Sequence, residues 1–206
     1  MEVFEYQTGP LQVNTYLVFD EAKEAFLIDP GSYLKQISNK IVEKELDLKY
    51  IVLTHGHGDH IGGIKQFKVD FPDVKVVALD AEKETLNDSV LNNSKILLNG
   101  EVTLDADLYV HDGETMKIGN MDLKFIATPG HTPGGMSILI GDKVFCGDTL
   151  FKGSIGRFDM PGGNYTELIN SIRTKLFTLP DETKVYPGHM NKTTIGWEKK
   201  HNPFVG

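Results

Sequence analysis

The sequence lacks several features, and each absence excludes a class of protein. Cys146 is its only cysteine, so no disulfide can form within the chain, and we expect a cytoplasmic location. No apolar run approaches the ~18 residues of a membrane-spanning helix, so we expect no membrane partner. The 21 Lys and Arg are outnumbered by 29 Asp and Glu, and the net charge of −8 argues against nucleic acid as a partner. Residues 1–12 hold no basic stretch followed by an apolar one, so we expect no secretory signal.

The composition and the order of apolar runs predict a folded chain of mixed architecture. Hydrophobic residues make up 40% and charged residues 24%, as in ordinary globular proteins, and 206 residues suit a single domain over 1–206. Short apolar runs predict strands at 16–19, 26–28, 50–53, 75–79, 108–110, 115–118, 121–127, 136–140, 143–146 and 184–186. Helical patterns predict helices at 34–46, 62–71, 81–91, 165–179 and 193–200. This arrangement favours two mixed sheets, face to face, with helices outside.

The most informative segment is 54–60, which follows the strand predicted at 50–53. It reads Thr-His-Gly-His-Gly-Asp-His, so three histidines and one aspartate lie within six positions. Imidazole nitrogen and carboxylate oxygen suit zinc, manganese or iron better than calcium or magnesium. Gly56 and Gly58 permit tight turns, so a loop could bring these donors together, whereas a helix would scatter them around its circumference. A solvated polar loop is the alternative, but so many donors in one segment favour a metal site.

Three further donors follow predicted strands and stand beside glycines, at His131, Asp148 and His189. With the cluster they make five histidines and two aspartates, a set that suits two metals about 3.5–4 Å apart sharing one carboxylate. We expect the remaining histidines, His111 and His201, to be solvated. Cys146 and Trp197 are expected to pack in the core, Cys146 rather than acting in catalysis.

These motifs resemble those of the metallo-beta-lactamase superfamily. The resemblance lies in residues 54–60, in the Gly-His and Gly-Asp pairs at 130–131, 147–148 and 188–189, and in Asp-Pro-Gly at 29–31. It covers nearly the whole chain and implies an α+β fold, an αββα sandwich of two mixed sheets flanked by helices, with a dimetal site at one edge of the sheets.

The resemblance also assigns the ligands of the two metals. It gives His55, His57 and His131 to the first metal, gives Asp59, His60 and His189 to the second, and makes Asp148 the bridge. Asp29 would lie outside the ligand set and hold the metal loop through hydrogen bonds; a helix N-cap is the plainer interpretation of that residue. The cofactors implied are two divalent metal ions, zinc foremost, with iron or manganese as alternatives.

Within the superfamily, the chain looks most like the short glyoxalase II-like hydrolases. This likeness lies in residues 147–151, 153–157, 161–164, 179–181 and 202–204. It implies a metal-dependent thioesterase acting on small S-acyl thiols such as S-lactoylglutathione, with Asp59 orienting the metal-bound hydroxide. Only 17 residues follow His189, too few for the helical domain that supplies much of the glutathione site in full glyoxalase II enzymes. Arg157 and Asp159 stand where those enzymes have Lys and Tyr; Arg157 could still bind a substrate carboxylate.

Other functions stay open at this point. A persulfide dioxygenase-like oxidoreductase would use one iron held by His55, His131 and Asp148, and a non-catalytic metal-binding protein would keep the fold without turnover. Lactones and phosphodiesters are alternative substrates for the same hydroxide. Zinc beta-lactamases of the family usually lack an aspartate at the bridging position, so Asp148 argues against them. We expect Lys152, Arg157 and 158–164 to border the substrate mouth, and the sequence leaves the oligomeric state open.

Overall fold

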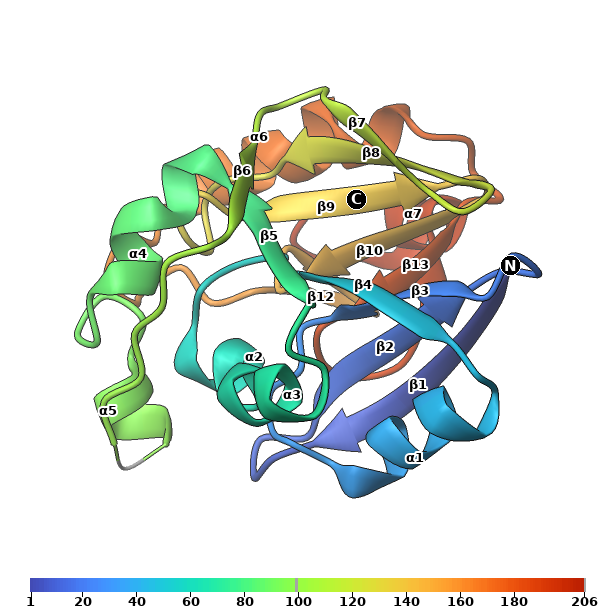
Figure 1. Cartoon of the computed structure of the whole chain (residues 1–206). Coiled ribbons are helices and arrows are strands. Elements are labelled where there is room, and N and C mark those ends of the chain that lie inside the picture. Colours follow the sequence, from blue (N-terminus) through green and yellow to red (C-terminus); the bar gives the residue numbers. More distant parts are fainter. Residues whose placement is uncertain (99, 206) are drawn as a thin grey trace.

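The computed structural model describes residues 1–98 and 100–205 and places twelve strands in two six-stranded sheets (Figure 1). The first sheet has the strand order β1-β2-β3-β4-β5-β6. Its strands are β1 (Glu2–Thr8), β2 (Val13–Phe19), β3 (Glu24–Ile28), β4 (Asp47–Val52), β5 (Lys75–Leu79) and β6 (Leu108–Val110). Strands β1 to β3 pair antiparallel and β3 to β6 pair in parallel, so the sheet is mixed.

The second sheet has the strand order β14-β13-β10-β9-β8-β7. Its strands are β7 (Thr115–Ile118), β8 (Met121–Ala127), β9 (Met136–Ile140), β10 (Lys143–Gly147), β13 (Lys184–Pro187) and β14 (Thr193–Thr194). Here β10 and β13 pair in parallel and the other neighbours antiparallel. A short hairpin of β11 (Leu150–Phe151) and β12 (Ser154–Ile155) forms a separate two-stranded sheet.

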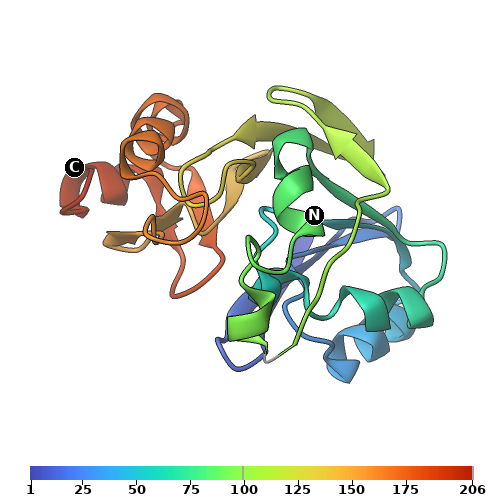
Figure 2. The same ribbon diagram turned by 90° about the vertical axis from the view of Figure 1, so that its left-hand side faces the viewer.

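Helices cover the outer face of each sheet. They are α1 (Lys35–Glu43), α2 (Gly58–Ile61), α3 (Ile64–Asp70), η1 (Asp80–Glu82), α4 (Lys83–Asn87), α5 (Ser94–Leu97), α6 (Tyr165–Thr174), η2 (Leu176–Thr178) and α7 (Ile195–His201). Helices α1 and α3 pack on the first sheet, and α6 and α7 pack on the second. Figure 2 shows the orange and red helices outside one sheet and the blue and cyan helices outside the other, which confirms the predicted αββα sandwich.

Strand β2 shows how the sequence produces these layers. All seven of its residues are buried, because successive side chains of a strand point to opposite faces and both faces of this sheet are covered. Tyr16 and Val18 pack in the core between the two sheets, whereas Leu17 and Phe19 pack against the helices. The near-continuous apolar run at 16–19 is therefore the signature of a sheet covered on both sides.

The helices are shorter than the sequence patterns predict. The helix predicted at 62–71 is preceded by a separate turn, α2, because the Gly63 N–H donates to the Pro30 carbonyl at 2.9 Å instead of continuing the α2 ladder. The helix predicted at 81–91 ends at Asn87, where the Asp88 side chain accepts the N–H of Val90 and of Leu91. Helix α5 was not predicted at all. Among the described residues, no helix combines the length and apolar character that crossing a bilayer requires.

Candidate metal centre

The predicted donors gather where strands of both sheets end. Asp29 and the cluster at 55–60 follow β3 and β4, which run in parallel. His131, Asp148 and His189 follow β8, β10 and β13. Strands β8 and β10 are both antiparallel to β9, and β13 is parallel to β10, so these three strands end at the same edge of their sheet. Chemistry-bearing residues at the carboxyl ends of neighbouring strands meet in this way in many α/β proteins.

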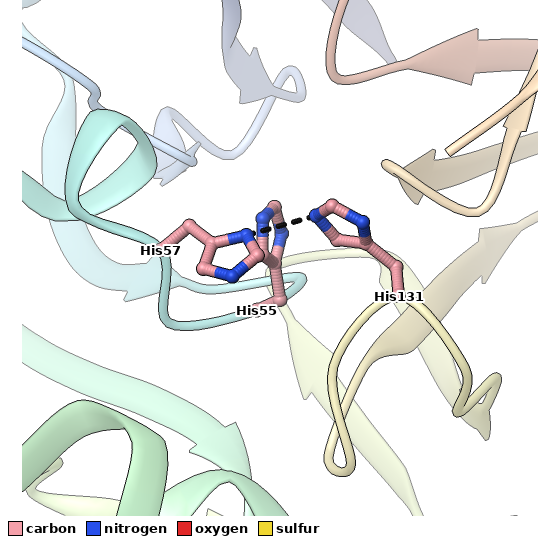
Figure 3. Close-up of side chains that lie close together, drawn as sticks. All are labelled: His55, His57 and His131. Carbon is pink, nitrogen blue, oxygen red and sulfur yellow. Dashed lines mark hydrogen bonds between the residues drawn. The ribbon is translucent and has the colours of Figure 1, made fainter. Parts of the chain in front are cut away.

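The first donor set consists of His55, His57 and His131, whose ligand atoms lie within 4.8 Å of one another (Figure 3). His57 Nδ1 and His131 Nε2 are 2.9 Å apart. His131 Nδ1 donates to the Arg157 carbonyl at 2.7 Å, so its proton is on Nδ1 and its Nε2 lone pair faces the set. The Nε2 atoms of His55 and His57 are buried and have no hydrogen-bond partner among the described residues.

The second donor set consists of Asp59, His60 and His189. His189 Nε2 lies 3.4 Å from Asp59 Oδ2 and 3.4 Å from His60 Nε2, and His60 Nε2 lies 3.8 Å from Asp59 Oδ2. Four ligands placed tetrahedrally about 2.1 Å from a zinc ion would stand roughly 3.4 Å apart, so this spacing fits a cation. Part of the cluster belongs to α2, not to a loop as predicted: Asp59 and His60 lie on its first turn.

Asp148 lies between the two sets. Its Oδ2 is 3.6 Å from His131 Nε2 and 3.5 Å from His189 Nε2, and its Oδ1 is 3.5 Å from His60 Nε2. These separations exceed hydrogen-bond lengths, and Oδ1 is buried without a hydrogen-bond partner among the described residues. An unpartnered buried carboxylate oxygen is costly, and a cation beside it would remove that cost. The two histidine and aspartate clusters therefore fit a dinuclear centre, and Asp148 lies between them.

Asp29 holds the second set in place and caps no helix. Its Oδ1 accepts the Thr54 N–H at 2.8 Å, and its Oδ2 accepts the Thr54 hydroxyl and lies 3.0 Å from His60 Nδ1. Helix α1 starts only at Lys35, with Leu34 at the N-cap, so the N-cap interpretation of Asp29 was wrong. Because both of its oxygens are engaged, Asp29 orients His60 and leaves His60 Nε2 free.

The electrostatics of the two sets differ. Burial lowers the pKa of His55 and His57 well below the usual range and also lowers that of His131, so all three imidazoles are neutral with lone pairs available. Burial alone would lower the pKa of His60 too, but the charges of Asp148 and the other nearby carboxylates raise it to about 10. The second set thus has the carboxylates needed to attract a cation.

A cavity of about 210 Å³ opens over the donors. Its walls, apart from the candidate ligands, are Leu11, Leu97, Phe151, Arg157 and Met160. The Arg157 guanidinium makes two hydrogen bonds of 2.9 Å to Asp159, so it lines the mouth with its charge already paired. The segment predicted to border the mouth thus does so through Arg157 and Met160.

Four other predictions concern residues away from the donors. Lys152 does not line this cavity; its ammonium lies over the Trp197 ring, 5.6 Å from the centroid. Trp197 is 37% exposed, so the expectation that it packs in the core was wrong. His111 and His201 are exposed as predicted. Cys146 is buried, which agrees with a core position, and burial raises its pKa to about 12.

Sequence reasoning missed Glu82. Its side chain is buried, and its two oxygens accept the N–H groups of Gly56 and Gly134, each at 2.7 Å. Burial raises the pKa of this carboxyl to about 7, although the two N–H groups oppose that rise. A glutamate in a predicted helix gives no sign of such a role, because the partners are backbone groups far away in sequence.

Known proteins resemble this chain over almost its full length. The profile of the metallo-beta-lactamase superfamily matches residues 8–189. A hydroxyacylglutathione hydrolase, GloC, of Haemophilus influenzae is 38% identical over 94% of this chain and 93% of its own. A probable metallo-hydrolase, YqgX, of Bacillus subtilis is 39% identical over 96% of this chain and 94% of its own.

Solved structures show the same likeness. The crystal structure of BLEG-1, described as a B3 metallo-beta-lactamase, has a TM-score of 0.92 and 36% identity, covering 99% of both chains. A protein described as TTHA1623 in a di-iron-bound form has a TM-score of 0.85 and 31% identity over 98% of this chain and all of its own. ETHE1 from Myxococcus xanthus has a TM-score of 0.81 and 33% identity over all of this chain and 84% of its own.

Proposed function

Because the chain belongs to the metallo-beta-lactamase superfamily, we propose that it is a dinuclear metal-dependent hydrolase that cleaves thioesters of small S-acyl thiols. The observation that carries the proposal is the pair of donor sets with Asp148 between them, facing an open cavity. The hydroxyacylglutathione hydrolase among the relatives supports the thioester as substrate. The proposed partners are accordingly small molecules, without nucleic acid or membrane.

The ligand assignment is part of this proposal. His55, His57 and His131 would hold one cation, Asp59, His60 and His189 the other, and Asp148 would contact both. When bound, two divalent cations lower the pKa of a shared water toward neutrality and polarise the carbonyl under attack. Zinc is the proposed metal, since imidazole and carboxylate donors suit it; iron is the alternative, supported by the neighbour in a di-iron-bound form.

The chain's own residues contribute orientation, charge and exclusion of water. Asp59 keeps its negative charge at neutral pH because the histidines around it lower its pKa despite its burial. We assign Asp59 to orienting the attacking water with its second carboxylate oxygen and to accepting the proton. Leu11, Phe151 and Met160 form apolar walls that keep bulk water from the thioester. No protein nucleophile is needed, and Cys146 is buried away from the cavity lining.

Arg157 is the proposed contact for an anionic group of the thiol. To bind a substrate carboxylate, its guanidinium must exchange the paired Asp159 for that carboxylate, which limits the gain in affinity. We therefore expect weak selection for glutathione over other small thiols.

The test measures metal content and turnover on the same preparation. Two metals per chain, with thiol release from S-lactoylglutathione that stops when a chelator removes the metal, is the expected result. One iron per chain with oxygen uptake on glutathione persulfide would replace the proposal by the oxidoreductase alternative.

Further arms of the same test address the remaining alternatives. Hydrolysis of a chromogenic cephalosporin faster than of any thioester would instead favour lactam hydrolysis, as the likeness to BLEG-1 suggests. Two bound metals with no turnover of any thioester, lactone, lactam or phosphodiester would identify a metal-binding protein without catalysis.

A further inference from the structure

Glu82 is a buried carboxyl group that lies outside the candidate ligand set. It is 1% exposed, yet it makes no ion pair with any residue that the structure describes. Instead its Oε1 accepts the Gly56 N–H and its Oε2 accepts the Gly134 N–H, both at 2.7 Å. Each carboxylate oxygen thus accepts one backbone N–H group. The two donors, at positions 56 and 134, are 78 residues apart in sequence.

The two segments are the loops that carry the first donor set. Gly56 stands between His55 and His57, and Gly134 belongs to the loop that begins after β8 and carries His131. The first loop follows a strand of one sheet and the second follows a strand of the other. One carboxylate therefore fixes the relative position of the three imidazoles that Figure 3 shows converging.

Close packing makes this contact rigid. A Cβ added at Gly134 would lie 2.1 Å from the Glu82 backbone nitrogen, so the loop at 129–134 is pressed directly against η1. A Cβ added at Gly56 would lie 3.0 Å from Leu86 Cδ2, so the other loop rests on α4. Both loops thus rest directly on the segment that carries Glu82, and a buried N–H group left without an acceptor is unfavourable.

A buried carboxylate also contacts the second donor set. Asp29 accepts the Thr54 N–H and lies against His60 Nδ1, so a buried carboxylate orients that set as well. Asp29 touches a candidate ligand directly, whereas Glu82 acts one peptide unit away from two of them. Partners behind metal ligands typically change metal affinity 10- to 100-fold when removed.

We propose that Glu82 is a positioning residue that holds the two loops of the first donor set in their metal-binding arrangement, an inference that rests on the ligand assignment of the proposed function. This role of Glu82 predicts that changing the residue weakens metal binding by the first donor set and not by the second. A purely structural role would weaken both sets equally, because global destabilisation does not distinguish between them.

The experiment uses Glu82→Gln in the full chain. Glutamine keeps the volume of the side chain but turns an NH₂ group toward one of the two N–H donors, so one loop loses its acceptor. The matched control is Glu198→Gln: Glu198 is also fully buried and accepts the Gly153 N–H at 3.0 Å and the Thr193 hydroxyl at 2.6 Å, but it contacts neither loop.

Zinc affinity is measured by competition with a chromogenic chelator in two backgrounds. His189→Ala leaves only the first donor set complete, and His131→Ala leaves only the second. Glu82→Gln is expected to weaken zinc binding 10- to 100-fold in the His189→Ala background and less than twofold in the His131→Ala background. Glu198→Gln is expected to change neither.

A readout without metal accompanies the affinities. In the metal-free protein, Glu82→Gln is expected to speed hydrogen exchange at least tenfold at whichever of the Gly56 and Gly134 amides faces the NH₂ group. Glu198→Gln is expected to leave the exchange of both of these amides unchanged. Equal losses of zinc affinity in both backgrounds, or none, would overturn the inference. If His131→Ala removes no zinc, the ligand assignment fails and not the role of Glu82. Should Glu82→Gln not fold, Glu82→Asp, too short to reach both loops, takes the same measurements.

Discussion

At the scale of single residues, three histidines of the candidate centre are oriented by contacts of their Nδ1 atoms. His131 donates to the Arg157 carbonyl, His60 lies against Asp29, and His189 lies 3.1 Å from the Leu11 carbonyl. The sequence could predict the donors, because histidine clusters are rare, and it could predict Asp29 from the family motif. It could not predict Arg157 or Leu11 in this role, because every residue has a backbone carbonyl.

Asp148 provides a residue-scale prediction. Asp148→Asn keeps the shape of the side chain and removes its charge and one anionic oxygen, so it is expected to lower kcat at least roughly a hundredfold and to reduce metal content from two toward one per chain. The measurement is thiol release beside elemental analysis. Asp142→Asn is the control, because Asp142 is exposed and pairs with Lys143 and Lys184 outside the centre. Near-normal turnover and metal content in Asp148→Asn would contradict the bridging role.

Cys146 provides a second prediction. Burial raises its pKa to about 12, so at pH 8 almost none of it is the reactive thiolate. The folded protein is expected to react with a thiol reagent at pH 8 at least a hundredfold more slowly than the chain unfolded in denaturant, and Cys146→Ala is expected to keep its turnover per bound metal. Rapid labelling of the folded chain together with loss of activity would point to a catalytic thiol instead.

At the scale of elements, strand ends were predictable and short helices were not. The apolar runs locate β4, β5, β8, β9 and β13 to within about three residues at each end, since buried strands need such runs whatever surrounds them. Helices α2 and α5 have four residues each, too few for a helical period to be visible. Glu82 ends η1 and falls within the helix predicted at 81–91, but a helical pattern does not show which backbone groups a side chain will contact.

The junction of β13 with its following loop supports an element-scale prediction. A Cβ at Gly188 would lie 2.3 Å from Asp148 Oδ1 and 2.7 Å from His60 Cε1, so Gly188→Ala must push apart two candidate ligands. We expect this variant to lose at least one metal per chain and to be destabilised by about 1–3 kcal/mol. The comparison is Gly100→Ala, where the nearest atom is 4.0 Å away. Full metal content in Gly188→Ala, measured by elemental analysis, would show that the loop can move without cost.

At the scale of the whole molecule, the candidate centre lies across the boundary between the two sheets. The cluster at 55–60 follows a strand of the first sheet, and His131, Asp148 and His189 follow strands of the second. Hydrogen bonds join the sheets at the same edge, from the Asn14 N–H to the Gly188 carbonyl and from the Met136 N–H to the Thr54 carbonyl, both at 2.7 Å. These contacts between the sheets thus bring the two halves of the centre together.

Metal bound across this boundary should hold the two sheets together. Each cation that binds only the folded chain adds about 2.7 kcal/mol to the free energy of unfolding when its free concentration is a hundred times Kd. For a chain of this size that corresponds to a rise in Tm of roughly 5–10 °C per cation. Calorimetry of the zinc-loaded and the chelator-treated protein is expected to show this difference, and Asp148→Asn is expected to reduce it, because the two donor sets then lose their common ligand. An equal Tm with and without zinc would have one of two meanings: the cations also bind the unfolded chain, or the centre contributes nothing to the contact between the sheets. Titration of zinc into the denatured chain distinguishes these two explanations.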